Sequence, residues 1–294
     1  MSKIRTNLPP AAAVLLLAAC GGGGGGGDAT GDISLAVTDA AVDSADAVWV
    51  QFSGVELKPQ SGPAFMVADF GPPRRINLLE LQSGVSEQLI DATVPAGRYN
   101  WIRLAVDAEQ GDATLSSIVI AGAEHPLWVP SGDETGLKLV SGVVVPAGGQ
   151  ADFTIDFDLR KSVHLPNDGS GDYMLRPALR LLDNTEVGAV AGTVAASLLT
   201  GDECSVYVFA GDVTPDDVDG TDPDPVTSAA VVLDPDSGEW RYHAAFLLAG
   251  PYTLAPTCDA ASDDPAVDDA GVVFVASEVA TAVANEVVSL DFTG

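Results

Sequence analysis

Segments in which apolar and polar residues alternate recur along the chain. Apolar residues occupy every second position in 32–38, 48–53, 101–106 and 153–160. A two-residue period places one side of a strand against a core and leaves the other side polar. Gly, Pro and Asp separate these segments at short intervals, as in sandwiches and barrels. The pattern predicts an all-β protein of antiparallel strands, with a short helical turn in 76–81.

The balance of charged residues changes abruptly near residues 183–187. Residues 28–184 contain 22 acidic and 10 basic residues, whereas residues 185–294 contain 20 acidic residues and one basic residue, Arg241. Such a shift indicates two modules with different surfaces. We predict two antiparallel β-sandwich domains with Greek-key-like connections, 32–184 and 187–294, and call them the N-terminal and C-terminal modules.

The first 19 residues have the features of a secretory signal peptide. Lys3 and Arg5 precede a nine-residue apolar run, 11–19, which is too short to span a bilayer. The run ends in Leu17-Ala18-Ala19-Cys20, which resembles the lipobox of bacterial lipoproteins. The resemblance implies that the peptide is cut before Cys20 and that Cys20 carries the lipids. The alternative is an ordinary signal peptide with an incidental cysteine.

A run of seven glycines, 21–27, follows this cysteine. Such a run cannot form a core, so residues 20–31 are predicted to be a flexible tether with a typical reach of ~18–20 Å. Position 21 holds Gly and not the Asp that tends to retain Gram-negative lipoproteins in the inner membrane. We therefore expect a cell-envelope protein held in the outer membrane by its N-terminal lipid.

Two further cysteines, Cys204 and Cys258, lie in the last third of the chain. An even pair in an exported protein predicts a disulfide. The alternative is a pair of free thiols, and a zinc site is disfavoured because no His lies near either cysteine in the sequence.

Composition and motifs exclude several functions. The formal charge of −29 argues against nucleic-acid binding, which requires basic patches that neutralise phosphates. The hydrophobic fraction of 47% is typical of a folded chain. The sequence lacks Gly-x-Ser-x-Gly, His-Glu-x-x-His and phosphate-loop motifs, so no catalytic residue is predicted.

One strand offers a candidate ligand face. Tyr99, Trp101 and Arg103 are expected to share the side of a strand opposite Ile102 and Leu104. If that side is open, the aromatic rings beside an arginine could stack on sugars or a peptide. If it is covered, the same residues are core and cation–π packing.

A second strand carries a candidate polar cluster. Asp156, Asp158 and Arg160 are expected on one strand face, followed by Lys161 and His164. A carboxylate pair could serve acid–base chemistry or hold a cation. The alternative is a solvated face in which Asp158 and Arg160 pair with neighbouring strands.

The segment 211–224 is rich in aspartate. Clustered carboxylates suit calcium, the one cofactor suggested by the sequence, although the spacing and terminal Glu of an EF-hand loop are missing. The alternative is a solvated acidic loop. The six candidates are Asp212, Asp216, Asp217, Asp219, Asp222 and Asp224.

Ordered sequence blocks resemble known modules. The N-terminal module is similar to the domain-of-unknown-function family 4382, found in bacterial lipoproteins, which carries no established activity. The matching blocks are LAVTDA (35–40), VWV (48–50), INLL (76–79), PAGRY (95–99), IRL (102–104), PSG (130–132), TGLK (135–138), DFDLRKS (156–162) and LRP (175–177). The C-terminal module resembles carboxypeptidase-regulatory or transthyretin-like sandwiches through GAVAGTV (188–194), CSVYVF (204–209), SGEWRY (237–242) and AGPY (249–252).

Three functions are consistent with these features. The first is a non-enzymatic binding or structural module that contacts a glycan or another envelope protein. The second is an envelope hydrolase such as a glycosidase, whose two carboxylates need no local motif. The third is a calcium-dependent adhesin, which differs from the first by its metal requirement.

Overall fold

The computed structural model describes residues 29–39, 45–130, 136–164, 169–176, 178–201, 203–265 and 267–294. The predicted signal peptide, Cys20 and the glycine run lie outside these residues. Strands dominate the described chain, so the all-β prediction is confirmed. The predicted helical turn is also confirmed, as the 3-10 helix η1 (Leu78–Leu81). No helix within the described ranges is long and apolar enough to cross a membrane.

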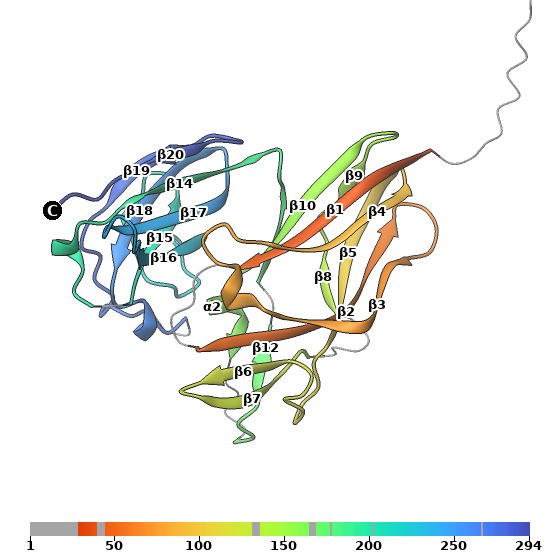
Figure 1. Ribbon diagram of the computed structural model, residues 1–294, viewed down its shortest axis with the longest axis horizontal. Helices are drawn as coiled ribbons and strands as arrows, with labels where there is room; N and C mark the ends of the chain where they lie inside the picture. Colours follow the sequence, from red (N-terminus) through yellow and green to blue (C-terminus); the bar gives the residue numbers. More distant parts are fainter. Residues whose placement is uncertain are drawn as a thin grey trace, which may run out of the picture.

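The N-terminal module consists of two sheets (Figure 1). The four-stranded sheet has the order β13 (Leu179–Asp183), β10 (Gln150–Phe157), β1 (Thr30–Asp39) and β4 (Glu87–Pro95). The nine-stranded sheet has the order β11 (Val163–His164), β12 (Tyr173–Leu175), β7 (Ala123–Trp128), β6 (Ser117–Ile120), β2 (Ala47–Pro59), β5 (Gly97–Asp107) and β8 (Leu137–Leu139). In addition, β3 (Phe65–Asn77) pairs with β2, and β9 (Val143–Val145) pairs with β5.

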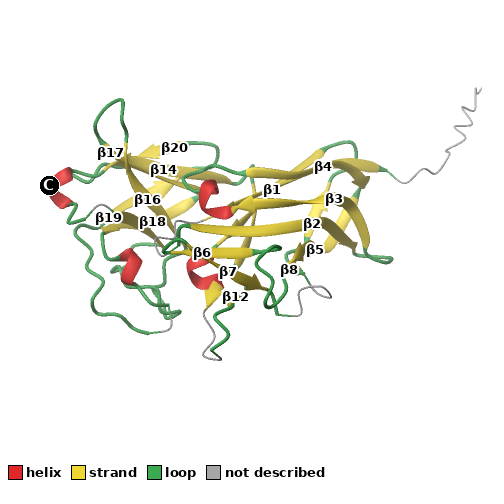
Figure 2. Ribbon diagram, turned by 60° about the horizontal axis from the view of Figure 1, so that its bottom comes forward, coloured by secondary structure: helices red, strands yellow, loops and turns green. Residues whose placement is uncertain are grey.

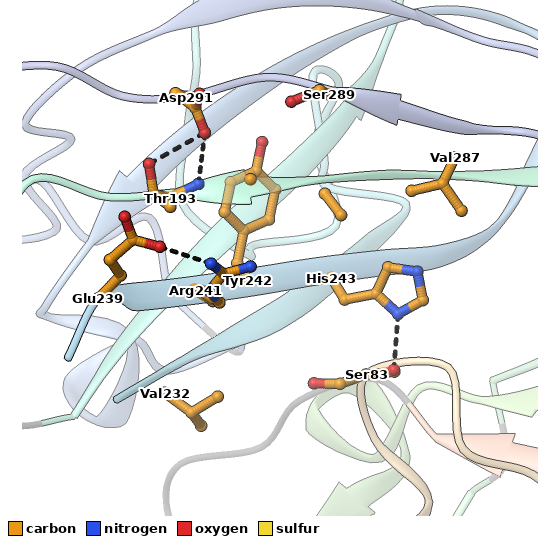
Figure 3. A pocket seen from close by; sticks show the side chains of 12 residues that line it. Ser83, Thr193, Val232, Glu239, Arg241, Tyr242, His243, Val287, Ser289 and Asp291 are labelled. Atoms are coloured by element: carbon orange, nitrogen blue, oxygen red, sulfur yellow. Dashed lines mark hydrogen bonds and ion pairs between the residues drawn. The ribbon is translucent and has the colours of Figure 1, made fainter. Parts of the chain in front are cut away.

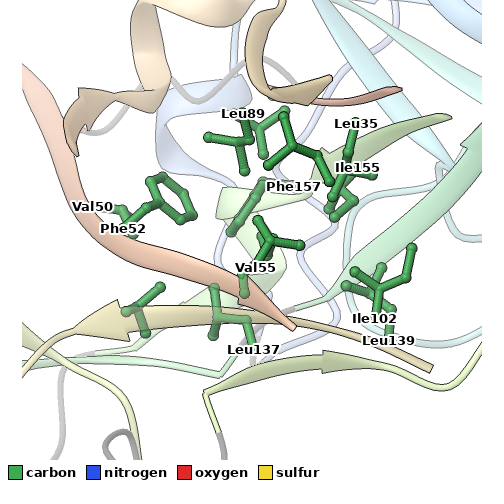
Figure 4. Packing of buried hydrophobic residues seen from close by; sticks show 14 of the residues in the cluster. Leu35, Val50, Phe52, Val55, Leu89, Ile102, Leu137, Leu139, Ile155 and Phe157 are labelled. Atoms are coloured by element: carbon green, nitrogen blue, oxygen red, sulfur yellow. The ribbon is translucent and has the colours of Figure 1, made fainter. Parts of the chain in front are cut away.

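Alternating side chains build the core between these two sheets (Figure 4). Leu35 and Ile155 project from the four-stranded sheet, and Val50 and Phe52 project from the nine-stranded sheet; all are buried. Phe52 meets Phe157 edge-on, with ring centroids 6.3 Å apart, and so joins the two sheets. Each such side chain contributes about 1.5–3 kcal/mol through burial, which fixes the strand register.

The C-terminal module is one rolled seven-stranded sheet. Its order is β19 (Glu278–Ala282), β18 (Gly250–Thr257), β15 (Cys204–Ala210), β16 (Thr227–Leu233), β17 (Trp240–Leu248), β14 (Val187–Thr193) and β20 (Val287–Ser289). Strand β19 approaches both β14 and β20, so the two halves of the sheet face each other across a core. The predicted disulfide between Cys204 and Cys258 is confirmed. It joins the start of β15 to the residue that follows β18.

Most strand pairs are antiparallel, as predicted, but three pairs differ. Strands β1 and β10, β7 and β12, and β14 and β20 run parallel. A parallel pair cannot be closed by a tight hairpin and needs a long connection. The long stretch of chain between the two strands of each pair provides this connection. The alternation of apolar and polar residues is the same for parallel and antiparallel strands, so it could not predict strand direction.

The two modules meet through α2 (Leu159–Ser162) and η1 (Figures 1 and 2). The turn 184–186 links β13 to β14, and the buried hydrophobic clusters on its two sides share no residue. Lys161 of α2 forms an ion pair with Asp224 and donates to the Pro225 carbonyl at 2.8 Å. His243 Nδ1 lies 2.8 Å from the carbonyl oxygen of Ser83, just after η1.

Candidate functional site

The predicted aromatic face on β5 is divided by a bulge. Lys58 pairs with Trp101 but Pro59 pairs with Tyr99, so Asn100 is the extra residue that reverses the direction of the preceding side chains. Tyr99 is therefore buried in the core, and its hydroxyl donates to the Pro95 carbonyl at 2.6 Å. The expectation that Tyr99 shares a strand face with Trp101 and Arg103 is wrong.

Trp101 and Arg103 do lie together on the outer face of the nine-stranded sheet, but cations cover the indole ring. The Lys138 ammonium lies 4.7 Å from the ring centroid, and the Arg103 guanidinium lies 5.9 Å from it. Arg103 also forms an ion pair with Glu56 on the neighbouring strand. This arrangement corresponds to cation–π packing and leaves little of the ring for a sugar.

The predicted polar cluster on β10 is not a strand face. The strand ends at Phe157, and Asp158 is the N-cap of α2, where its carboxylate accepts from the Lys161 amide at 3.3 Å. His164 lies on β11, in the other sheet. The expectation that Asp156, Asp158 and Arg160 alternate on one strand therefore fails, because the cap satisfies a free helix N–H group and turns the chain.

The acids at this end of the four-stranded sheet are buried. Asp156 is 3% exposed and pairs with Arg180, yet burial outweighs the arginine and raises its pKa. Burial raises the pKa of Asp158 as well. The pKa of Asp39 is raised well above its ordinary value, first by burial and then by repulsion from Asp156 and Asp158. Neither Asp39 carboxylate oxygen has a well-formed hydrogen bond within the described residues.

Arg160 extends from α2 into the C-terminal module. Its guanidinium lies 4.7 Å from the Tyr207 ring centroid and 3.7 Å from Asp263 Oδ2. Asp263 accepts from the Tyr207 hydroxyl at 2.6 Å and from the Val218 amide, and burial raises the pKa of Asp263 to about 6.

Perturbed acids often mark active sites. Here, however, the void beside Asp158, Arg160 and Lys161 measures only about 10 Å³, at the lower limit for one water molecule. Arg160 and Lys161, which line this void, pair instead with Asp263 and Asp224 of the C-terminal module.

The six aspartates of 211–224 do not converge. Asp217 is buried and accepts from the Asp269 amide, whereas Asp224 pairs with Lys161. Asp219 caps the amide of Thr221, and Asp212, Asp216 and Asp222 are exposed. Across the described ranges, no three His, Cys, Asp or Glu side chains are arranged to hold a metal ion. Among the described residues, the six aspartates therefore do not form the calcium site that the sequence suggested.

A groove of about 620 Å³, with both polar and apolar walls, lies on the outer side of β14, β17 and β20 (Figure 3). Val232 and Val287 form part of its apolar wall. Thr193, Arg241, His243, Ser289 and Asp291 line it from the C-terminal module, and Ser83 closes one end from the N-terminal module. Asp291 accepts from the Thr193 amide at 2.8 Å and from the Thr193 hydroxyl at 2.9 Å. These hydrogen bonds lower the pKa of Asp291, so it is an anionic acceptor at neutral pH.

Arg241 provides the positive charge of this groove. Its Nε lies 3.1 Å from Asp234 Oδ2, and its guanidinium also pairs with Glu239. The arginine side chain remains 51% exposed despite these contacts. The groove therefore offers Arg241 as a donor and Asp291 as an acceptor, and both side chains are exposed to solvent.

Two glycines allow the groove to form. A Cβ atom on Gly192 would lie 1.8 Å from the Leu290 carbonyl, so only glycine permits the last segment of the chain to approach β14. Gly84 has φ of +87° and contacts the His243 ring, where an added Cβ would lie 2.8 Å from the nearest ring atom. The groove residues were not predicted from the sequence, although Arg241, the lone basic residue of its half, was a signal that could have indicated them.

Comparison with sequence families identifies the N-terminal module. The model of the family described as Domain of unknown function (DUF4382) matches residues 30–177, half of the chain. This chain belongs to the DUF4382 family. The predicted family resemblance is thus confirmed for the N-terminal module, whereas the transthyretin-like resemblance of the C-terminal module stays a prediction. No curated protein matches the sequence.

Several solved structures show distant similarity. The Bacillus anthracis TIE protein is 11% identical with a TM-score of 0.18; the alignment covers 90% of this chain and 33% of that one, so this chain spans a third of its length. The CBM26 module of Eubacterium rectale Amy13K, solved with maltoheptaose, is 10% identical with a TM-score of 0.22 and coverages of 90% and 92%. The Streptococcus agalactiae minor pilin GBS52 is 11% identical with a TM-score of 0.19 and coverages of 88% and 94%.

Proposed function

We propose that this DUF4382 protein is a lipid-anchored, non-enzymatic binding protein of the cell envelope, and that the groove beside β14, β17 and β20 binds a neutral glycan. The anchor is the lipid predicted on Cys20, in the outer membrane. The observation that carries the binding proposal is the open groove of mixed polar and apolar lining that includes Arg241 and Asp291.

The chemistry of the groove favours a ligand rich in hydroxyl groups. Its volume lies within the range of about 300–1,000 Å³ that is typical of small-molecule sites. Thr193 and Ser289 supply hydroxyls, Arg241 supplies donors, and Asp291 supplies an acceptor. Opposite charges line the same groove, so a ligand without net charge meets the least repulsion.

A larger hollow of about 770 Å³ lies beside the acidic loop. Its walls are formed mainly by Val213, Pro215, Pro223 and Val226, with the carboxylates of Asp216, Asp222 and Asp224. Carboxylates and apolar groups provide few hydrogen-bond donors, so this hollow suits a glycan less well than the groove does.

The arrangement of acids favours binding over hydrolysis. A glycosidase needs two carboxyl groups that flank an accessible sugar, about 5–10 Å apart. The acids that the sequence suggested, Asp156 and Asp158, instead contact Arg180 and Lys161 beside a closed void.

Binding to a glycan panel tests the groove. The lipidated chain, solubilised in detergent, is titrated by calorimetry with neutral and anionic oligosaccharides. We expect a neutral oligosaccharide to bind, and Arg241→Ala to weaken binding about tenfold or more through the loss of a charge-assisted hydrogen bond. Arg176→Ala removes an exposed arginine of the N-terminal module and is the matched control. Equal binding by both variants, or no binding of any neutral glycan, would refute the groove proposal.

The anchor is tested separately with Cys20→Ala. Removal of the lipidated thiol should release the protein from sedimented membranes into the soluble fraction. A variant that still sediments with membranes would show that lipid on Cys20 is not the anchor.

A further inference from the structure

Basic side chains gather on one part of a strongly acidic protein. Lys58, Arg98, Arg103 and Lys138 lie on the outer face of the nine-stranded sheet, and we call these four residues the basic patch. Cross-strand pairing places Lys58 beside Trp101, Arg103 beside Lys138, and Arg98 beside Val144. Residues opposite each other in a sheet share a face, so these side chains form one continuous surface.

Apolar side chains are exposed within the same surface. Val140 is 75% exposed and Val144 is 55% exposed. Glu56 neutralises Arg103, but within the described residues no carboxylate pairs with Arg98 or Lys138. The exposed Asp32 and Asp91 lie on the other sheet, where Asp32 accepts from Thr93. Among the described residues, the basic patch therefore carries more basic than acidic side chains.

The patch begins at the end of the module from which the chain leads to Cys20. Ala29 accepts from the amide of Ala96 at 2.7 Å, and Arg98 follows two residues later. The turn that joins β9 to β10 contacts this same end, since the Gly148 amide donates to Thr30 at 2.7 Å. Residues 21–29 lead from Cys20 to this end, and the tether predicted for this segment would reach ~15–18 Å.

We propose that the basic patch docks the N-terminal module onto the anionic phosphate headgroups of the membrane that holds the lipid. This inference rests on the proposed lipid anchor. The ammonium and guanidinium groups would contact phosphates, while the exposed side chain of Val144 would face the headgroup layer beside them.

The net charge of −29 does not prevent this contact. At physiological ionic strength, charges farther away than ~8 Å are largely screened, so the membrane meets the local charge of the patch. Each basic residue near an anionic surface favours contact by roughly fivefold. The acidic C-terminal module, joined at the α2 end, would be held away from the membrane, with its groove free for a ligand.

Hydrogen exchange of the reconstituted lipoprotein tests the proposal. The full lipidated chain is placed in vesicles of phosphatidylcholine alone or with 40% phosphatidylglycerol, and backbone exchange is followed by mass spectrometry. We expect peptides that cover 97–104 and 137–145 to exchange about fivefold more slowly in the anionic vesicles at low salt. One molar salt should abolish the difference, because the screening length falls to ~3 Å.

Charge-reversal variants separate docking from anchoring. Arg98→Glu with Lys138→Glu should remove the protection, whereas Arg176→Glu, beside α2, should retain it. Unchanged thermal unfolding shows that the variants are folded. Equal exchange in both vesicle types, with the protein still floating with the vesicles, overturns docking and leaves the anchor intact. Protein that floats with neither vesicle type overturns the anchor itself.

Discussion

Asp263 makes the stability of the C-terminal module depend on pH. Its carboxylate is buried between the Tyr207 hydroxyl, the Val218 amide and the Arg160 guanidinium, and burial is the largest cause of its raised pKa. The folded protein binds the proton more tightly than the unfolded chain does. The unfolding free energy should therefore fall as the pH rises from about 4 to about 6.

The size of this effect follows from the pKa difference. The pKa of Asp263 is about 6 in the folded protein against 3.8 for an ordinary aspartate. At ~1.4 kcal/mol per pH unit, the folded module loses on the order of 2–3 kcal/mol between these values. The pKa values of Asp39, Asp156 and Asp158 are also raised, so these acids add to the loss of stability as the pH rises. The pKa values of Asp234 and Asp291 are lowered, and this opposes the trend only below about pH 4. We expect greatest stability near pH 4.

Thermal unfolding of the wild-type chain and of Asp263→Asn at pH 4.8 and 7.5 measures the effect. Asparagine retains an acceptor for Tyr207 and Val218 but cannot ionise. The wild type should melt several degrees higher at pH 4.8, and Asp263→Asn should lose much of that difference. Asp236→Asn removes an exposed charge from the same module and is the control. A wild-type midpoint that is equal or higher at pH 7.5, or an unchanged difference in Asp263→Asn, would refute the reasoning.

Two further predictions concern the C-terminal module. The disulfide between Cys204 and Cys258 spans 54 residues, so replacing both cysteines by Ser should lower the unfolding free energy by about 4 kcal/mol in urea titrations. Addition of reductant should destabilise the wild type but not this variant. Gly192→Ala should cost about 2–4 kcal/mol because its Cβ would overlap the Leu290 backbone, whereas Gly201→Ala, with its nearest contact at 3.9 Å, should cost less than 1 kcal/mol. Equal losses for the two alanine variants would contradict the packing argument.

Local sequence was enough to identify strands but not their surroundings. Ile33, Leu35 and Val37 alternate with polar residues and are fully buried, as a two-residue period predicts. Thr154 and Asp156 occupy the polar positions of β10 and are buried too. Arg180, which pairs with Asp156, lies close enough to affect the pKa of Tyr252 in the C-terminal module, so a second layer approaches this face. Burial by a distant segment leaves no trace in local periodicity.

The predicted side-chain directions were wrong at single residues for similar reasons. The extra residue Asn100 turns Tyr99 into the core, and the cap formed by Asp158 ends β10 before Arg160. A bulge and a cap each depend on which strand or helix end lies opposite. Both features give a different direction to side chains that the sequence analysis had assigned to candidate ligand faces.

By itself, the sequence determined the all-β architecture, the short turn at η1, the pairing of Cys204 with Cys258 and the family of the N-terminal module, because each depends on local pattern or on a small set of partners. Only the tertiary structure decided the groove and the basic patch. His243 and Ser83 are 160 positions apart and meet across the modules, and β5, β8 and β9 join their outward side chains into one surface. Such sites arise from strand pairing and module contact, which alternation of residue types does not encode.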